Sequence, residues 1–159
     1  MIGLDTSVVV RYLVGTPAAQ AKRAARLIDD HANDCGVSLV ALAESAHVLR
    51  TQYEVGQRDI IDALIGFIQR ANVRVIDSRS DVLVEALVRA RDLPGRPIPD
   101  AMIVAASLAA DAVPLATFDR GQRRYGIETR DPREASDRRK STSPSTIQAM
   151  PGIKSTGEK

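Results

Sequence analysis

The amino-acid sequence predicts an α/β fold in which a mostly parallel sheet is flanked by helices. Three features of the pattern indicate this fold: short apolar runs of strand length recur, longer runs with helical periodicity separate them, and the two kinds alternate in order. The 159 residues suffice for one domain with a hydrophobic core. We place that domain at residues 1–132.

The first strand is expected at Met1–Asp5, because this short apolar run ends on an acid. A helix follows over Val8–Val14 and ends at the Gly-Thr-Pro turn at residues 15–17. Proline is favoured at the first position of a helix, so Pro17 opens the next one, which runs to about Asn33.

A second strand is expected at Cys35–Leu39, before a helix at Val40–Gln52. Glu44 lies on an apolar stripe of that helix, one turn after Val40 and one turn before Val48. The chain then continues with a helix, a strand and a helix, at Asp59–Ala71, Val73–Ile76 and Ser80–Leu93. The first of these helices is apolar over more than half its surface. Core burial explains much of that, and a homodimer or partner contact is the alternative for the remainder.

The stretch from Ile98 to Gly121 is predicted to be a helix, a turn and a strand, buried on most sides. The helix is expected over Ala101–Ala110 and the strand over Leu115–Phe118, with Ile127–Arg130 as a candidate last edge strand. An acid stands at each edge of the stretch: Asp100 before the helix and Asp119 after the strand.

The composition limits where in the cell the protein is expected and which partners it is expected to bind. Cys35 is the single cysteine, which excludes an intramolecular disulfide and argues against structural zinc; it is expected to be a buried apolar residue. The N-terminus lacks the features of a signal peptide, and no apolar run reaches the roughly 18 residues of a membrane span, so we expect a cytoplasmic protein. Residues 1–135 carry 17 basic and 18 acidic side chains, so the folded part is not a basic nucleic-acid-binding body. The polar, basic tail at residues 133–159 is expected to be disordered.

Four acids stand where an α/β sheet binds ligands, outside the carboxyl ends of its strands. Asp5 and Asp119 each end a predicted strand, Asp100 begins a helix, and Glu44 projects from one, so we expect them to converge. Each also has an ordinary explanation. Asp5 and Asp100 are suited to capping helices, Asp119 to a turn, and Glu44 to a core ion pair with an arginine.

A divalent cation accounts for all four acids together. Two carboxylates about 4 Å apart repel by roughly 4 kcal/mol at an effective dielectric constant near 20. Several in one pocket stay ionised only with a cation, and oxygen ligands without His or Cys suit Mg²⁺ or Mn²⁺. Such a site can activate water and stabilise the leaving oxygen of a phosphodiester.

Four segments carry a family resemblance: MIGLDTSVVVRYL, SLVALAES, PDAMIVAASLA and LATFDRG. Together, and in this order, they resemble the PIN-domain nucleases, above all the VapC-type toxins of toxin–antitoxin pairs. The resemblance covers Met1 to about Pro132. It implies a three-layer sandwich in which acids matching Asp5, Glu44, Asp100 and Asp119 hold Mg²⁺ or Mn²⁺ and cut single-stranded or structured RNA. It also implies a homodimer and an antitoxin segment that covers the acidic pocket.

Finer roles follow from the same resemblance. Asp5 and Asp100 are expected to be the main metal ligands, while Glu44 and Asp119 ligate the metal, hold a second one or orient the attacking water. The hydroxyls expected to support the site are those of Thr6 or Ser7 and of Thr117.

Basic residues near these acids have two interpretations. Arg120, Arg123 and Arg124 either contact RNA phosphates or form a solvated turn. His47 is either structural or a proton carrier near the site. The predicted function is that of a metal-dependent endoribonuclease toxin. The alternatives are a non-catalytic module whose acidic pocket receives a basic antitoxin segment, and a metal-dependent phosphatase.

Overall fold

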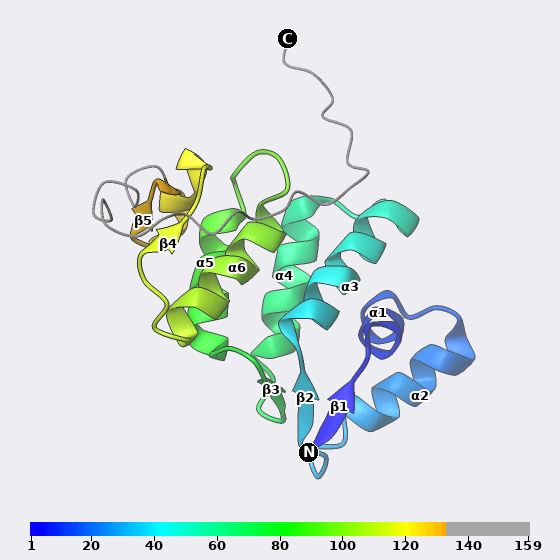
Figure 1. Cartoon of the computed structure of the whole chain (residues 1–159). Coiled ribbons are helices and arrows are strands. Elements are labelled where there is room, and N and C mark those ends of the chain that lie inside the picture. The colour runs from blue at the N-terminus through cyan, green and yellow to red at the C-terminus, as the bar shows by residue number, and fades with distance from the viewer. Residues whose placement is uncertain (133–159) are drawn as a thin grey trace, which may run out of the picture.

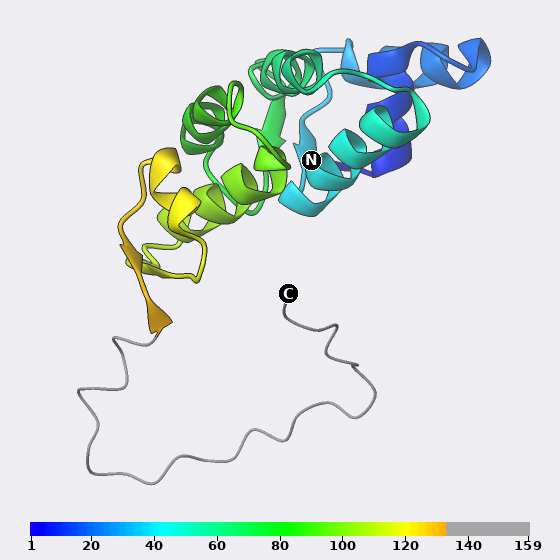
Figure 2. The same cartoon turned by 90° about the horizontal axis from the view of Figure 1, so that it is seen from above.

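A parallel sheet forms the centre of the fold in the computed structural model, which describes residues 1–132 (Figure 1). The strand order is β1–β2–β3, and both neighbouring pairs are parallel; the strands are β1 (Ile2–Leu4), β2 (Cys35–Val37) and β3 (Val73–Val75). Helices flank this sheet, which confirms the predicted α/β fold with a parallel central sheet (Figure 2). The tail predicted to be disordered, residues 133–159, lies outside the described residues.

Within residues 1–132, six α-helices connect the strands, close to the positions that the sequence predicts. They are α1 (Thr6–Val14), α2 (Ala18–Ile28), α3 (Leu39–Gln52), α4 (Gln57–Ile68), α5 (Ser80–Ala90) and α6 (Pro97–Ala109). Most boundaries lie within three residues of the prediction, and two differ by more. Helix α2 ends about five residues earlier than predicted, because the chain turns at Asp29–Asn33 to enter β2. Helix α6 begins earlier than predicted, with Pro97 in its first turn, where the missing N–H of proline costs no helical hydrogen bond. None of the described helices is long and apolar enough to cross a membrane.

The apolar surface of α4 is used by the core. Ile60, Ile61, Leu64, Phe67 and Ile68 are all at most 2% exposed. Core burial therefore accounts for the apolar character of this helix, and no partner is needed to explain it. Cys35 is likewise fully buried within β2, and burial raises the pKa of its thiol.

Helices α5 and α6 pack closely through alanines. Ala86 and Ala90 of α5, together with Ala101 and Ala105 of α6, are at most 2% exposed. Small side chains at a helix–helix contact let the two backbones approach each other closely. This contact fixes the start of α6, where Asp100 lies.

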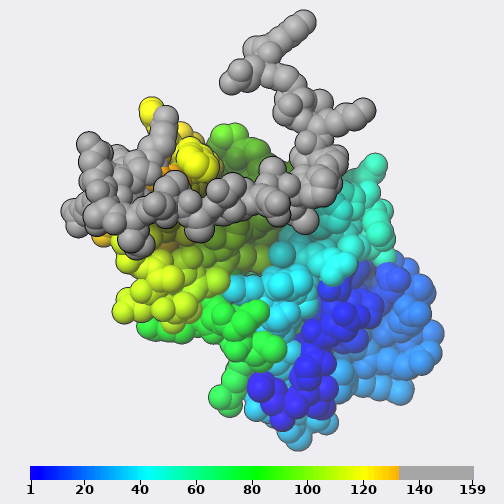
Figure 3. Space-filling model, in the orientation of Figure 1, coloured from blue at the N-terminus to red at the C-terminus, as the bar shows by residue number. Residues whose placement is uncertain are grey.

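A second small sheet lies apart from the central one. Its strands, β4 (Leu115–Ala116) and β5 (Thr129–Arg130), pair in parallel and are joined through the 3₁₀ helix η1 (Arg120–Tyr125). We expected Leu115–Phe118 to be a buried strand, but Ala116 is exposed and Phe118 is 77% exposed. The prediction fails because β4 pairs with β5 and not with the central sheet, so its faces are not covered on both sides. The two regions that contain α1–α2 and β4–β5 lie at opposite ends of the molecule (Figures 1 and 2), and Figure 3 shows the same separation of the blue and the yellow surfaces.

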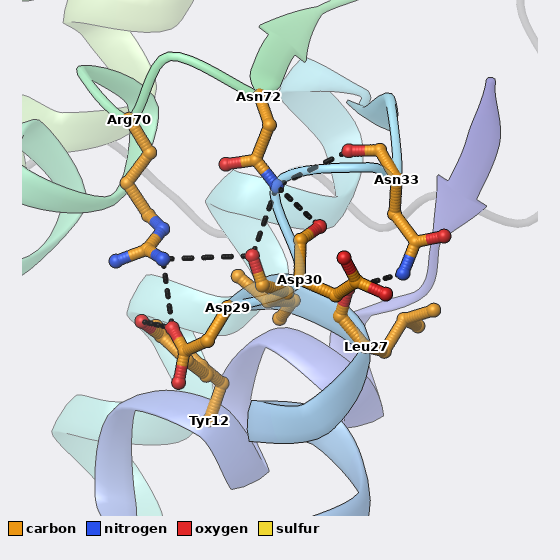
Figure 4. A network of polar contacts seen from close by, with 8 residues as sticks. Tyr12, Leu27, Asp29, Asp30, Asn33, Arg70 and Asn72 are labelled. Atoms are coloured by element: carbon orange, nitrogen blue, oxygen red, sulfur yellow. Dashed lines mark hydrogen bonds and ion pairs between the residues drawn. The ribbon is translucent and has the colours of Figure 1, made fainter.

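A polar network fastens α1 and α2 to the central sheet (Figure 4). The amide of Asn72, which is 7% exposed, donates to the carbonyl oxygens of Ile28, Asp30 and Asn33 at 2.9, 3.4 and 3.2 Å. Arg70 forms an ion pair with Asp29 at 2.7 Å, and the same Asp29 oxygen accepts from the Tyr12 hydroxyl at 2.8 Å. The last carbonyl groups of α2 have no intrahelical N–H donor, and side chains from the segment between α4 and β3 supply donors to the end of this helix and to the turn that follows it.

Candidate metal centre

Asp5 follows β1 directly and caps the N-terminus of α1. Its Oδ2 accepts from the hydroxyl of Ser7 at 2.8 Å and from the backbone N–H of Ser7 at 3.3 Å. These two hydrogen bonds lower the pKa of the exposed Asp5 carboxyl, with the hydroxyl contributing most. Asp5 is therefore ionised throughout the neutral range and has a second oxygen available for a ligand.

Glu44 projects from α3 toward the same region. Its Oε2 accepts from the Thr6 hydroxyl at 3.3 Å, so α1 and α3 meet at this pair of side chains. We predicted that Glu44 shares an apolar stripe with Val40 and Val48. The stripe is not buried, because Glu44 and Val40 are exposed and Val48 is only half-buried. Within residues 1–132, Glu44 forms no ion pair, which removes the core ion pair as its explanation.

Asp5 and Glu44 line one cavity of about 280 Å³. Thr6, Ser7 and Arg11 complete its polar wall. The guanidinium of Arg11 is held by two hydrogen bonds: its Nε donates to the Gln20 side chain at 2.8 Å, and its Nη1 donates to the Tyr53 hydroxyl at 2.6 Å. The cavity thus combines two carboxylates that have no cationic partner with one fixed guanidinium at its edge.

Asp119 lies at the far end of the molecule, after β4, and caps η1. Its Oδ1 accepts from the backbone N–H of Gly121 at 2.7 Å, and its own N–H donates to the Thr117 hydroxyl oxygen at 3.0 Å. A Cβ on Gly121 would lie 3.0 Å from Oδ1 of Asp119, so the close approach of this loop to the carboxylate favours glycine.

Asp100 and Asp119 line a second cavity, of about 300 Å³, together with Arg124 and Tyr125. Tyr125 is 5% exposed and donates to the carbonyl oxygen of Pro97 at 3.2 Å. Burial, together with the negative charges of Asp100 and Asp119, raises the pKa of Tyr125 to about 12. Because both carboxylates raise the pKa of the same phenol, both lie near the Tyr125 hydroxyl. Asp100 belongs to the first turn of α6 but does not cap it, because the helix begins at Pro97.

The four predicted acids therefore form two pairs. No group of three or more potential metal ligands occurs among residues 1–132. The expectation that all four converge assumed that β1 and β4 end at one edge of one sheet. They belong to different sheets, which is why Asp5 and Asp119 are apart. A single centre with four carboxylates stays a prediction, and the geometry described here supplies two two-carboxylate sites.

Either pair fits a hard divalent cation. Mg²⁺ retains several water ligands in proteins and takes only one or two carboxylates, with substrate oxygens filling other positions. Among residues 1–132, neither carboxylate of either pair forms an ion pair, and neither cavity is lined by cysteine or histidine. The donor chemistry therefore matches Mg²⁺ or Mn²⁺ better than zinc.

The remaining candidates divide between the two cavities. The hydroxyls of Thr6 and Ser7 donate to Glu44 and Asp5, and the hydroxyl oxygen of Thr117 accepts from the backbone N–H of Asp119; their support of a catalytic site stays a prediction. Of the three arginines after Asp119, Arg124 lines the second cavity, whereas the Nε of Arg123 is held by Thr129 at 2.7 Å. Arg120 is exposed and lines neither acidic cavity.

Two cavity residues escaped prediction. Arg11 was treated as part of a helix, although its position four residues after Ser7 places both on one helical face. The burial of Tyr125 beside two acids depends on how η1 packs on α5 and α6, which no local pattern encodes.

A parallel sheet with carboxylates beyond the ends of its strands is an arrangement suited to phosphodiester chemistry. The family model of the PIN domain matches residues 2–128, and the chain belongs to the PIN domain family. PIN domains are usually nucleases, so membership of this family supports a hydrolase. PIN nucleases generally use Mg²⁺ or Mn²⁺. Comparisons with curated proteins and with solved structures gave no match.

Proposed function

We propose that this PIN-domain protein is a Mg²⁺- or Mn²⁺-dependent endoribonuclease and the toxin of a toxin–antitoxin pair. The observation that carries the proposal is the pair formed by Asp5 and Glu44. Both carboxylates are exposed, line one cavity and have no basic partner among the described residues. Carboxylates that are exposed and without ion pairs, beyond the carboxyl end of β1, are available for a cation.

The residues of the first cavity prepare it for this task. The hydrogen bonds from Ser7 keep Asp5 ionised and fix the direction of its free oxygen. Thr6 restrains Glu44 on the opposite wall. A bound divalent cation would supply Lewis-acid activation of water and of the scissile phosphodiester. Arg11 offers a positive charge at the edge, where a phosphate would arrive.

The second cavity supports the same function in another way. Asp100 and Asp119 face Arg124, so acid and base lie together in one hollow. A cation held by the acids and the guanidinium would both favour a phosphate-bearing strand. In the proposed function Asp5 and Asp100 are the main ligands, and Glu44 and Asp119 orient water or complete the coordination.

The proposed partners follow from the charge of the cavities. Unpaired carboxylates in an open hollow attract a basic segment, which suits a cognate antitoxin that covers the site and blocks substrate. Self-association into a homodimer belongs to the same proposal, as does action on RNA in the cytoplasm.

Cleavage assays with the full chain test the enzymatic part. End-labelled RNA, a hairpin RNA and single-stranded DNA of equal sequence are incubated with Mg²⁺, Mn²⁺ or excess EDTA. We expect RNA cleavage with either metal and none with EDTA. Full cleavage in EDTA, or hydrolysis of a small phosphate ester with intact RNA, would refute the endoribonuclease.

Growth assays test the toxin part. Induced expression should arrest growth, and co-expression of a small protein encoded directly upstream should relieve the arrest. Arrest that persists with the Asp5→Asn variant would separate toxicity from the proposed chemistry.

A further inference from the structure

A small basic pocket lies between α3 and the start of α6, separate from both acidic cavities. Its volume is about 110 Å³. The polar side chains that line it are His47, Arg50 and Thr51 from α3 and Arg96, which precedes α6. The other lining residues are alanines, Ile98 and Pro99, and none carries a carboxylate. The pocket is therefore positive and concave, which is unusual on a folded part that carries nearly equal numbers of acids and bases.

The basic groups of this pocket are not engaged by acids. Elsewhere in residues 1–132, six arginines form ion pairs with an aspartate or a glutamate: Arg58, Arg70, Arg74, Arg79, Arg89 and Arg91. Within the same residues, the side chains of His47 and Arg96 form no hydrogen bond or ion pair. Arg50 makes one long hydrogen bond, to Gln57 at 3.4 Å. Most of the donors of the pocket thus remain free for an anion.

The basic pocket shares a helix with each acid pair: α3 with the first pair and α6 with the second. On α3, Glu44 faces the first acidic cavity, whereas Ala43, His47 and Arg50 face the basic pocket. Adjacent residues of an α-helix differ by about 100° in direction, so these two stripes are neighbours on one helix. On α6, Pro99 lines the basic pocket and the next residue, Asp100, lines the second acidic cavity.

We propose that this pocket binds a phosphodiester group of the RNA strand, one that neighbours the group held at the carboxylates. The proposal rests on the proposed ribonuclease function. Guanidinium groups match the oxygens of a phosphate through paired N–H donors, and two of them converge here with an imidazole. Backbone contacts of this kind set the register of a strand without reading its bases, which suits a chain poor in exposed aromatic residues.

RNA binding in EDTA tests the pocket apart from cleavage. A fluorescein-labelled single-stranded RNA is titrated with the full chain at several salt concentrations. The variants are Arg50→Gln, Arg96→Gln and the double substitution. The matched control is Arg58→Gln, an exposed arginine of α4. We expect each pocket variant to weaken binding roughly 3- to 10-fold and to reduce the salt slope by about 0.7. Arg58→Gln should change neither quantity.

One further variant and one further measurement separate a loss of RNA contacts from a loss of folding. Arg50→Lys should restore part of the affinity and all of the salt slope, because it keeps the charge and loses the paired donors. Melting curves of every variant show whether a loss of RNA affinity arises from unfolding. If the double variant unfolds, the single variants test the pocket.

The outcomes separate the pocket from the proposed function. Wild-type affinity and salt slope in the double variant, with intact cleavage by the wild type, would overturn the pocket and leave the ribonuclease standing. If the wild type binds RNA without cleaving it in Mn²⁺, the ribonuclease fails, while weaker binding by the double variant still supports the pocket. A wild-type chain that does not bind RNA at all overturns the pocket.

Discussion

The two acid pairs of this PIN domain have similar ligands but different surroundings. Asp5 and Glu44 are exposed and are restrained by the hydroxyls of neighbouring residues. Asp100 and Asp119 line one cavity together with the buried Tyr125 and an arginine, and their charges raise the pKa of Tyr125. In the proposed function, the first pair would therefore hold mainly a cation, and the second would serve both a cation and the phosphate that accompanies it.

The scaffolds behind the pairs differ as well. The helices that carry Asp5 are tied to the sheet by hydrogen bonds and an ion pair around Asn72 and Arg70 (Figure 4). The helix that carries Asp100 is held by apolar contact with α5 and by the Tyr125 hydroxyl. A polar network fixes geometry but depends on every member, whereas apolar packing tolerates small changes. The two sites should therefore fail differently when they are perturbed.

The largest effect should come from removing one charge from either pair. Asp5→Asn and Asp100→Asn keep the shape of the side chain but weaken it as a ligand. If both pairs serve one reaction, each substitution should lower kcat/KM for RNA by about 100-fold or more. Initial rates with Mn²⁺ as the added metal measure this.

The comparison of the two variants is the sharper result. Asp59→Asn, on the exposed first turn of α4, is the matched control and should retain wild-type rates. Loss of activity in only one of the two pairs would mean that the other is not part of the catalytic centre. Wild-type rates in both variants would contradict the assignment of these acids altogether.

Removing the amide of Asn72 should have the next largest effect, on stability. Asn72→Ala removes one donor from each of three carbonyl oxygens, at the end of α2 and in the turn after it, and Asn72 is only 7% exposed. We expect a loss of roughly 1–3 kcal/mol in the free energy of unfolding. Urea unfolding measures it, with Gln69→Ala, an exposed neighbour, as the control.

Hydrogen exchange shows where that stability is lost. Amides of α1 and α2 should exchange faster in Asn72→Ala, while those of α5 and α6 should change little. Equal acceleration in both regions would show that the network does not act on the first acid pair in particular.

Much of the fold was predictable from the sequence because its elements are encoded locally. Alternation of apolar runs marked the strands of the central sheet, and helical periodicity marked the helices between them, within a few residues at the ends. The partners of β4 were not predictable, because an apolar run of strand length does not say which strand lies beside it. Its pairing with β5 is a property of tertiary packing.

The site was predictable by residue type but not by arrangement. Asp5, Asp100 and Asp119 were identified from their positions at element boundaries and Glu44 from its place on a helix, and the structure confirms that Asp5 and Asp119 follow strands. The division into two pairs depends on sheet membership, which the sequence does not state. The Asn72 network and the basic pocket join residues far apart in the chain, such as Arg50 and Arg96, and no local motif marks them.

The smallest effect, and the most direct check on the second pair, is the titration of Tyr125. A phenol whose pKa is raised in the folded state stabilises the fold below its ordinary pKa, and that contribution is lost as the pH rises through the folded value. For Tyr125 the window runs from about 10 to about 12. Asp119→Asn removes one of the two charges that raise this pKa, so Tyr125 should lose its proton at lower pH. The ring carbon beside the hydroxyl, observed by NMR in tyrosine-labelled protein, reports the midpoint, and Glu44→Gln in the other pair is the control. An unchanged midpoint in Asp119→Asn would show that Asp119 does not lie near Tyr125, and the second acid pair would lose its main support.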